Sequence, residues 1–380
     1  MVPEIVMTVF KYPFKRSVMA AVLLAIGLTP LQLAAQQQNA STLPDVLEMP
    51  AMETRHAQSS LQLGVSRAGQ RLVAVGVRGI VLLSDDEGAS WRQAKHVPVS
   101  VTLTGVEFVS PERGWAIGHS GVLLLTEDAG ETWTLRMDGT QAAALVLAEA
   151  REQLARGEDG AERAIRNAEY LVEDGPDKPF LDVSFVDAQR GYLIGAYGLA
   201  LETLNGGESW HSIVGRIPNS GGSHLYQILP KQDKLLIVGE QGSIFLSEDQ
   251  AQSFESFETP YPGTFFGGLW LEDDGMLVFG LQGNVWRSID RGDSWQQIET
   301  PQAVTITAGL RVSDGSLLLA DESGHLLSSR DNGASLIELP VSSGAGATDL
   351  LESANGSLIF SSMRGVRQIE NSKLVAGGNP

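Results

Sequence analysis

A single turn motif recurs along the chain and constrains its fold more than any other feature. The motif reads Ser/Thr-x-Asp-x-Gly-x-x-Trp and is complete at residues 84–91, 126–133 and 288–295. Residues 203–210 carry Asn in place of Asp, and two more copies begin at Ser247 and Ser329 and depart further from the motif. Each copy follows a short apolar run that a glycine opens. A repeat of this kind indicates an architecture built from equal modules.

The glycines that open the apolar runs recur about every 41 residues, apart from one longer step that contains an insertion. They are Gly79, Gly121, Gly198, Gly242, Gly283, Gly324 and Gly365. Four short β-rich runs separated by turns fill one repeat, as in residues 264–300. This content is typical of a propeller blade, whose two apolar faces must be covered by neighbouring blades. The sequence therefore predicts an all-β fold, a seven-bladed β-propeller over residues 59–375.

The two ends of the propeller raise the question of how the ring closes. The last repeat, residues 348–368, lacks a turn motif after its final glycine, and an N-terminal segment, residues 36–58, precedes the first full repeat. We expect residues 45–52 to add a ring-closing strand to the last blade. Such a strand would remove an exposed sheet edge, which promotes aggregation.

The turn motif has a structural explanation that needs no ligand. Its Asp or Asn can accept hydrogen bonds from backbone N–H groups, its Gly tolerates a positive φ, and its Trp can cover the hairpin. The spacing of the acidic residues differs from that of a Ca²⁺-binding loop. We assign a structural role to Asp86, Trp91, Asp128, Trp133, Asn205, Trp210, Asp249, Phe254, Asp290, Trp295 and Asp331.

The start of the chain has the pattern of a secretory signal peptide. Basic residues precede an apolar run over residues 18–33, and small residues follow it. Thr29-Pro30 interrupts the run, which argues against a retained membrane anchor. We expect residues 1–35 to be removed by cleavage near Ala35 and the mature protein to be in the bacterial periplasm. Cysteine is absent, which excludes disulfides and thiolate metal sites.

The composition excludes several classes of function. The net charge of −19 would repel phosphate backbones, so no nucleic-acid partner is expected. The six histidines are dispersed, without the paired spacing of a metal site. No phosphate-binding loop, nucleophile elbow or dinucleotide fingerprint stands at a strand-to-helix junction. We therefore predict no catalytic residue, no metal and no cofactor.

Residues 140–178 interrupt the β pattern between the second and third repeats. Residues 141–156 and 161–173 have the apolar spacing of two amphipathic helices. We predict a helical-hairpin insertion between blades 2 and 3, which either packs on the rim of the propeller or docks a partner protein. For the docking alternative the apolar residues are Leu145, Leu154, Ile165 and Leu171.

The position of the insertion predicts which face of the ring binds a partner. A connection between blades lies on the same face as the turns between second and third strands. Varied residues at these turns are held on a rigid scaffold, which is where binding residues concentrate. The predicted binding residues, each beside a turn glycine, are Arg78, His119, Tyr197, Gln241, Gln282 and Arg364.

Two longer stretches carry a family resemblance. Residues 108–121 read Phe-Val-Ser-Pro-Glu-Arg-Gly-Trp-Ala-Ile-Gly-His-Ser-Gly, and residues 185–198 read Phe-Val-Asp-Ala-Gln-Arg-Gly-Tyr-Leu-Ile-Gly-Ala-Tyr-Gly. With the motifs that follow them, they resemble the photosystem II stability and assembly factor family, which has BNR (Asp-box) repeats. The resemblance covers roughly residues 61–368. It implies a non-enzymatic seven-bladed propeller of the thylakoid lumen or periplasm that acts in photosynthesis by helping new membrane subunits assemble.

The resemblance also implies an arginine-rich patch for an acidic partner segment. This acidic chain offers only scattered candidates, such as Arg78, Arg113, Arg190 and Arg364. We therefore expect an exported, non-catalytic monomer without a membrane anchor that binds a membrane protein or an assembly intermediate of a membrane complex. One candidate partner is a transporter of a non-photosynthetic bacterium.

An enzyme remains the competing hypothesis. The triplet Arg216-Ile217-Pro218 matches the arginine motif of sialidases, although it lies in mid-chain. A central arginine cluster beside a Tyr–Glu pair would favour a sialidase-like glycoside hydrolase. A shallow acidic or aromatic surface would favour the binding protein, and an aromatic platform would favour a propeller that binds glycans without cleaving them.

Overall fold

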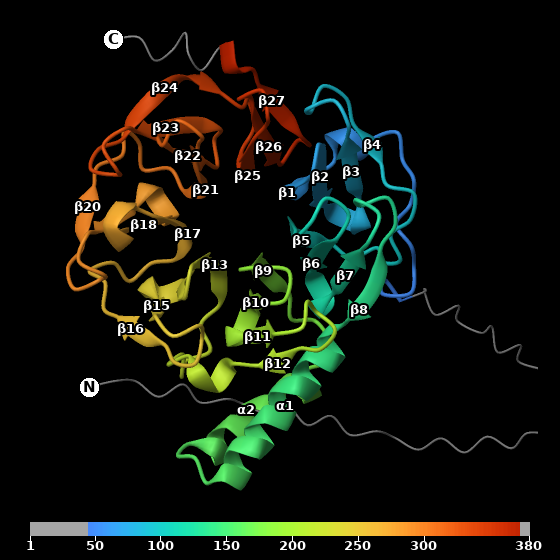
Figure 1. The fold of residues 1–380 in the computed structure, drawn as a ribbon, viewed down its shortest axis with the longest axis vertical. Coiled ribbons are helices and arrows are strands. Elements are labelled where there is room, and N and C mark those ends of the chain that lie inside the picture. The colour runs from blue at the N-terminus through green and yellow to red at the C-terminus, as the bar shows by residue number, and fades with distance from the viewer. Residues whose placement is uncertain (1–44, 373–380) are drawn as a thin grey trace, which may run out of the picture. The chain divides into compact units, whose positions relative to one another are not determined.

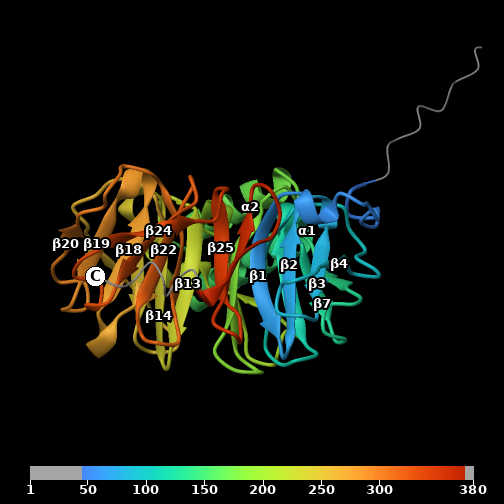
Figure 2. The ribbon, with the colours of Figure 1, turned by 90° about the horizontal axis from the view of Figure 1, so that it is seen from above.

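The computed structural model describes residues 45–372, which form a closed ring of seven antiparallel sheets (Figure 1). Six of these sheets have four strands and the seventh has three. Seen edge-on, the ring is a flat disc whose strands run between two opposite faces (Figure 2). The predicted all-β seven-bladed propeller is confirmed. The predicted signal peptide, residues 1–35, lies outside the described residues.

The strands of each blade follow one another along the chain from the axis to the rim (Figure 1). Blade 1 consists of β1 (Gln62–Ala68), β2 (Arg71–Gly76), β3 (Val81–Ser84) and β4 (Arg92–Gln93). Blade 2 consists of β5 (Leu103–Phe108), β6 (Gly114–Gly118), β7 (Leu123–Thr126) and β8 (Thr134–Met137). Blade 3 consists of β9 (Phe180–Phe185), β10 (Gly191–Gly195), β11 (Ala200–Thr203) and β12 (His211–Ser212).

The other four blades have the same order, and only the last lacks a fourth strand among the described residues. Blade 4 consists of β13 (Leu225–Lys231), β14 (Lys234–Gly239), β15 (Ile244–Ser247) and β16 (Glu255–Phe257), and blade 5 of β17 (Phe265–Trp270), β18 (Met276–Gly280), β19 (Val285–Ser288) and β20 (Gln296–Ile298). Blade 6 consists of β21 (Ile306–Arg311), β22 (Leu317–Asp321), β23 (His325–Ser329) and β24 (Ile337–Ser342). Blade 7 consists of β25 (Ala347–Glu352), β26 (Leu358–Ser362) and β27 (Arg367–Ile369).

Burial explains why the second strand of a blade reads as a continuous apolar run. β10 and β22, for example, are buried along their whole length. Both faces of a blade are covered by the blades beside it, so alternation between apolar and polar residues is lost. The fourth strand lies at the rim, where β8 exposes three of its four residues.

A β-bulge interrupts the innermost strand of every blade at the same place, close to where the strand begins. A bulge leaves one residue unpaired and redirects it. The seven bulged residues are Leu63, Thr104, Leu181, Tyr226, Phe266, Thr307 and Thr348.

The predicted ring-closing strand is wrong for the part of the N-terminal segment that the structure describes. Residues 45–58 contain no strand, and residues 36–44 lie outside the described residues. The N–H of Ala51 donates to the carbonyl of Val97 (3.0 Å), so this segment lies against the connection between blades 1 and 2.

The ring closes instead by direct packing of β25 against β1. Thr348 Oγ1 donates to the carbonyl of Gln62 (2.7 Å), and the N–H of Val65 donates to Asp349 Oδ2 (2.9 Å). Side-chain hydrogen bonds of the same kind join other neighbouring innermost strands. The ring therefore closes without an N-terminal strand in the sheet of the last blade.

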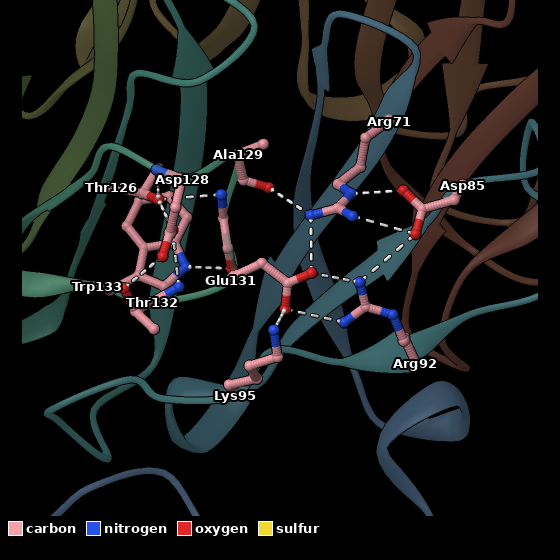
Figure 3. Close-up of polar contacts among 11 residues, drawn as sticks. Arg71, Asp85, Arg92, Lys95, Thr126, Asp128, Ala129, Glu131, Thr132 and Trp133 are labelled. Atoms are coloured by element: carbon pink, nitrogen blue, oxygen red, sulfur yellow. Dashed lines mark hydrogen bonds and ion pairs between the residues drawn. The ribbon is translucent and has the colours of Figure 1, made fainter.

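An ion-pair network joins blades 1 and 2 (Figure 3). Arg71 and Arg92 of blade 1 contact Glu131 of blade 2 at 3.1 Å and 2.5 Å, and Lys95 lies 3.4 Å from the same carboxylate. The hydrogen bond from Arg92, with the charges of all three bases, lowers the pKa of Glu131 to about 2. Both arginines also contact Asp85 of blade 1, so the network spans the seam between the blades.

The predicted helical hairpin between blades 2 and 3 is confirmed (Figure 1). Helix α1 spans Gly139–Arg156 and helix α2 spans Ala161–Glu173. α1 begins at a capping box, in which the Asp138 side chain accepts from the N–H of Gln141 and the Gln141 side chain accepts from the N–H of Asp138. No helix among residues 45–372 is long and apolar enough to cross a membrane.

Candidate functional site

The two faces of the disc carry different turns. Turns between second and third strands touch the connections between blades: the N–H of Gly79 donates to the carbonyl of Val101, and that of Gly242 donates to the carbonyl of Gly263. Gly121 lies against Gly139 at the start of α1. We call this side the insertion face. The turn motifs connect third to fourth strands and therefore lie on the opposite side, the motif face.

All six residues predicted for the binding face are exposed there. Tyr197, Gln241 and Gln282 share a left-handed backbone conformation with φ between 55° and 57°, as does Arg78 at 56°. In blade 2 the equivalent residue is Ser120 (φ 58°), so His119 lies one position before the place that the repeat predicts.

A cavity of about 440 Å³ lies where the seven innermost strands meet. Its lining consists of all seven bulged residues together with Leu281, Thr305 and Glu322, and we call it the central mouth. Leu281 and Glu322 belong to turns between second and third strands of blades 5 and 6. The central mouth is therefore part of the insertion face.

Aromatic side chains form one side of the central mouth. The rings of Tyr226 and Phe266 meet edge-to-face with centroids 5.0 Å apart. Burial, and then the charge of Glu240, raise the pKa of the Tyr226 phenol. Leu63 and Leu181 line the cavity from the first and third blades. Apolar walls with a few polar groups are typical of ligand sites.

Beside the bulges, polar side chains join successive innermost strands. Thr104 Oγ1 donates to the carbonyl of Phe180 (2.7 Å), and Thr307 Oγ1 donates to that of Ala347 (2.8 Å). These bonds satisfy strand edges at the axis that would otherwise be unpaired.

Three carboxylates accept hydrogen bonds across the same seams. Glu107 accepts from the N–H of Phe185 (3.0 Å), and Asp182 accepts from the N–H of Ile228 (2.8 Å). Asp349 accepts from the N–H of Val65 in blade 1. Burial raises their pKa values to about 8, about 7 and about 6 respectively. Neighbouring carboxylates add to the rise for Glu107 and Asp182. None of the three forms a salt bridge within the described residues.

Glu107→Gln should raise the free energy of unfolding by about 1–2 kcal/mol at pH 9 and change it little at pH 5. The folded pKa of Glu107 lies above its ordinary value of 4.5, so the folded state holds this proton more tightly than the unfolded state. Stability that the protonated form supplies is therefore lost as pH rises through about 8. Gln keeps the acceptor and cannot ionise.

Denaturant unfolding at both pH values measures this effect. Glu127→Gln is the matched control, because Glu127 is exposed and forms no side-chain bond among the described residues. A gain that is equal at pH 5 and pH 9 would show that the charge of Glu107 is not its cause.

The hairpin packs on the rim of the propeller. Ala142, Val146 and Ala168 join the apolar cluster that contains Trp115 and Trp210. Of the four residues predicted for docking, Leu145, Ile165 and Leu171 are partly buried against this cluster, whereas Leu154 is exposed. Arg163 Nη2 also donates to the carbonyl of Ser220 (2.7 Å). A cleft of about 280 Å³ remains between the helices and blade 3.

The turn motifs use their polar atoms within the turn. In blade 2, Asp128 Oδ1 accepts from Thr126 Oγ1 (2.9 Å) and from the N–H of Thr132 (2.9 Å), while Oδ2 accepts from Thr132 Oγ1 (2.6 Å). Trp133 is buried and donates to the carbonyl of Gly130 (3.0 Å). The three bonds to the carboxylate recur at Asp86, Asp249, Asp290 and Asp331.

The candidate arginines are not brought together. Arg78 and Arg364 belong to the insertion face, in the turns between second and third strands of blades 1 and 7. Arg113 and Arg190 directly precede the second strands of blades 2 and 3, on the motif face. Arg216 pairs with Glu202 (2.7 Å) in blade 3, away from the central mouth. No described arginine lines the mouth.

Part of the sequence matches a known protein family. Residues 170–337 match the family model described as photosynthesis system II assembly factor YCF48. The matched residues, less than half of the chain, resemble this family. The expected resemblance to the photosystem II assembly factor family is thereby confirmed. No curated protein sequence matches the chain.

Solved structures show the same architecture at low identity. YCF48 bound to D1 peptide has a TM-score of 0.60 and 14% identity, covering 84% of this chain and 98% of its own. YCF48 from Cyanidioschyzon merolae has a TM-score of 0.60 and 13% identity, covering 83% and 97%. A streptogramin B lyase has a TM-score of 0.59 and 13% identity, and the match covers 86% of this chain and 99% of the lyase. These likenesses show the fold alone, which hosts binding proteins and enzymes.

Proposed function

We propose that this YCF48-like propeller is an exported, non-catalytic assembly factor that binds a membrane protein, or an assembly intermediate of a membrane complex, through its insertion face. The observation that carries the proposal is the central mouth, a cavity with apolar and aromatic walls surrounded by exposed turn residues. The YCF48 structure with a D1 peptide supports it, because a propeller of this shape there holds a peptide.

The chemistry of the central mouth favours binding over glycoside hydrolysis. Tyr226 and Glu322 line it, but the arginine cluster that a sialidase-like site would need does not, and the arginine of the sialidase-like triplet is paired elsewhere. Among residues 45–372 no cluster of three or more His, Asp or Glu side chains is placed to hold a metal ion. An acidic and aromatic surface suits a protein partner.

Location and partner complete the proposal. We place the mature protein in the periplasm as a monomer, with a membrane complex such as a transporter in a non-photosynthetic bacterium as one candidate partner. Fractionation of the host cell tests the location: the protein should be in the periplasmic fraction and should begin near residue 36.

Site-specific photo-crosslinking in living cells tests the binding role. A photoreactive amino acid at Gln282, on the insertion face, should form an adduct with an integral membrane protein. The same group at Glu127, on the motif face, should not. A third position, Leu154, decides whether the hairpin also contacts the partner. Adducts of equal yield from both faces, or no membrane-protein adduct at Gln282, would contradict the proposal.

A further inference from the structure

We propose that the central mouth receives a basic side chain, of lysine or arginine, from an exposed segment of the partner. This inference rests on the proposed function and specifies the chemistry that the partner must present. It combines three observations: a cavity of suitable size, aromatic and aliphatic walls, and a described lining that contains one carboxylate, Glu322, and no cation.

The walls of the central mouth suit both parts of a basic side chain. At about 440 Å³ the cavity lies within the range of small-ligand sites. Leu63 and Leu181 can contact an aliphatic stem, as apolar surfaces do for lysine and arginine. Tyr226 and Phe266 supply π-systems, which attract a cation over their faces.

The charges around the mouth are predominantly negative. Glu322 lines it and forms no salt bridge within the described residues, and Glu240 is near enough to act on the Tyr226 phenol. Asp182 and Asp349 directly follow the bulged residues Leu181 and Thr348 in their strands. Carboxylates around a concave site of low polarity focus a negative potential into it.

The cations of residues 45–372 do not neutralise this site. Lys178 is buried against Asp174 and Asp177, with its Nζ 5.5 Å from the centre of the Tyr197 ring. His224 pairs with Glu240 at 3.5 Å and can offset that one charge only when protonated. Arg78 and Arg364 belong to turns on the same face but do not line the mouth.

The charge of the central mouth is opposite in sign to the charge that the family resemblance implies for a binding site. That resemblance leads one to expect an arginine patch for an acidic partner segment, whereas Glu322 is the only charged residue that the described part of the chain contributes to the lining. A basic ligand should also favour ionisation of Asp182 and Asp349 beside the mouth, whose pKa values burial raises to about 7 and about 6. Affinity should therefore increase as pH rises from 6 to 8.5.

Fluorescence anisotropy with the purified full chain tests the inference. The probe is a labelled dodecapeptide of Gly and Ser with a central Leu-Lys-Leu-Lys, compared with a twin in which both lysines are Glu. The lysine peptide should bind at least about 10-fold more tightly. Glu322→Gln should weaken its binding about 3-fold or more, and Phe266→Leu should also weaken it. Glu338→Gln, an exposed change on β24, is the control and should have no effect.

The outcomes separate this inference from the proposed function. Equal or tighter binding of the glutamate peptide, no binding of either peptide, or no effect of Glu322→Gln would overturn the basic-side-chain site. If the Gln282 crosslink to a membrane protein persists in that case, the proposed function stands without it. If the lysine peptide binds but no membrane protein is crosslinked, the mouth chemistry stands and the proposed function fails.

Discussion

Gly207→Ala is expected to lower the free energy of unfolding by about 3–5 kcal/mol, or to prevent folding. A Cβ at this position would lie 2.2 Å from Cζ2 of Trp115, which has no exposed surface. Trp115 cannot move aside, because it stacks on Phe185 at 6.1 Å and meets Trp210 edge-on at 6.2 Å. The added methyl group would therefore force blades 2 and 3 apart.

Gly175→Ala separates this steric effect from backbone strain. Gly175 has φ 81°, close to the 85° of Gly207, but a Cβ there would have no atom within 4 Å. Its substitution should cost only about 1 kcal/mol. Urea unfolding followed by circular dichroism compares the two variants with the parent protein. Equal losses would show that the backbone conformation, rather than contact between blades, sets the cost.

Other motif glycines also lie against a side chain of the neighbouring blade. This close contact is a second reason, besides the positive φ, why the motif requires glycine. A Cβ on Gly88 would meet Ile359 of blade 7 at 2.7 Å, and one on Gly130 would meet Leu83 of blade 1 at 3.1 Å. Each of these motifs thus rests on the preceding blade. The sequence pattern predicts the positive φ of these residues, but it cannot show which neighbouring side chain lies against them.

The architecture could be predicted because the repeat is local. The spacing of Gly79 and its equivalents determines how many blades there are, and the lapse of the β pattern over residues 140–178 locates the insertion. Consecutive antiparallel strands alternate in direction. This rule predicts that turns between second and third strands lie on one face of the ring and turns between third and fourth strands on the other. None of these steps requires knowledge of contacts between distant parts of the chain.

Features that depend on distant contacts could not be predicted. Ring closure rests on Thr348 and Gln62, and nothing in either segment alone distinguishes their bond from a shared strand. The apolar spacing of residues 161–173 predicts a helix with one apolar face, but not that the propeller rim covers it. The central mouth depends on seven bulges, for which glycines after some bulged residues, such as Gly64 and Gly105, are only a partial signal.

Asp128→Ala should lower the free energy of unfolding by about 2–3 kcal/mol, because it removes an acceptor that serves the backbone N–H of Thr132 and the hydroxyls of Thr126 and Thr132. The loss should extend beyond the turn, since the turn holds the buried Trp133 against blade 1. Thermal unfolding followed by tryptophan fluorescence measures the change.

Asp128→Asn is the matched variant, and blade 3 shows what it should do. There Asn205 Oδ1 accepts from the N–H of Ser209 (3.0 Å) and from Thr203 Oγ1 (2.9 Å), while its amide donates to Ser209 Oγ (2.9 Å). The amide thus replaces each bond of the carboxylate, with one hydroxyl reversed from donor to acceptor. We expect Asp128→Asn to cost less than about 1 kcal/mol. A loss as large as that of Asp128→Ala would mean that the negative charge itself is required, which a purely structural turn does not explain.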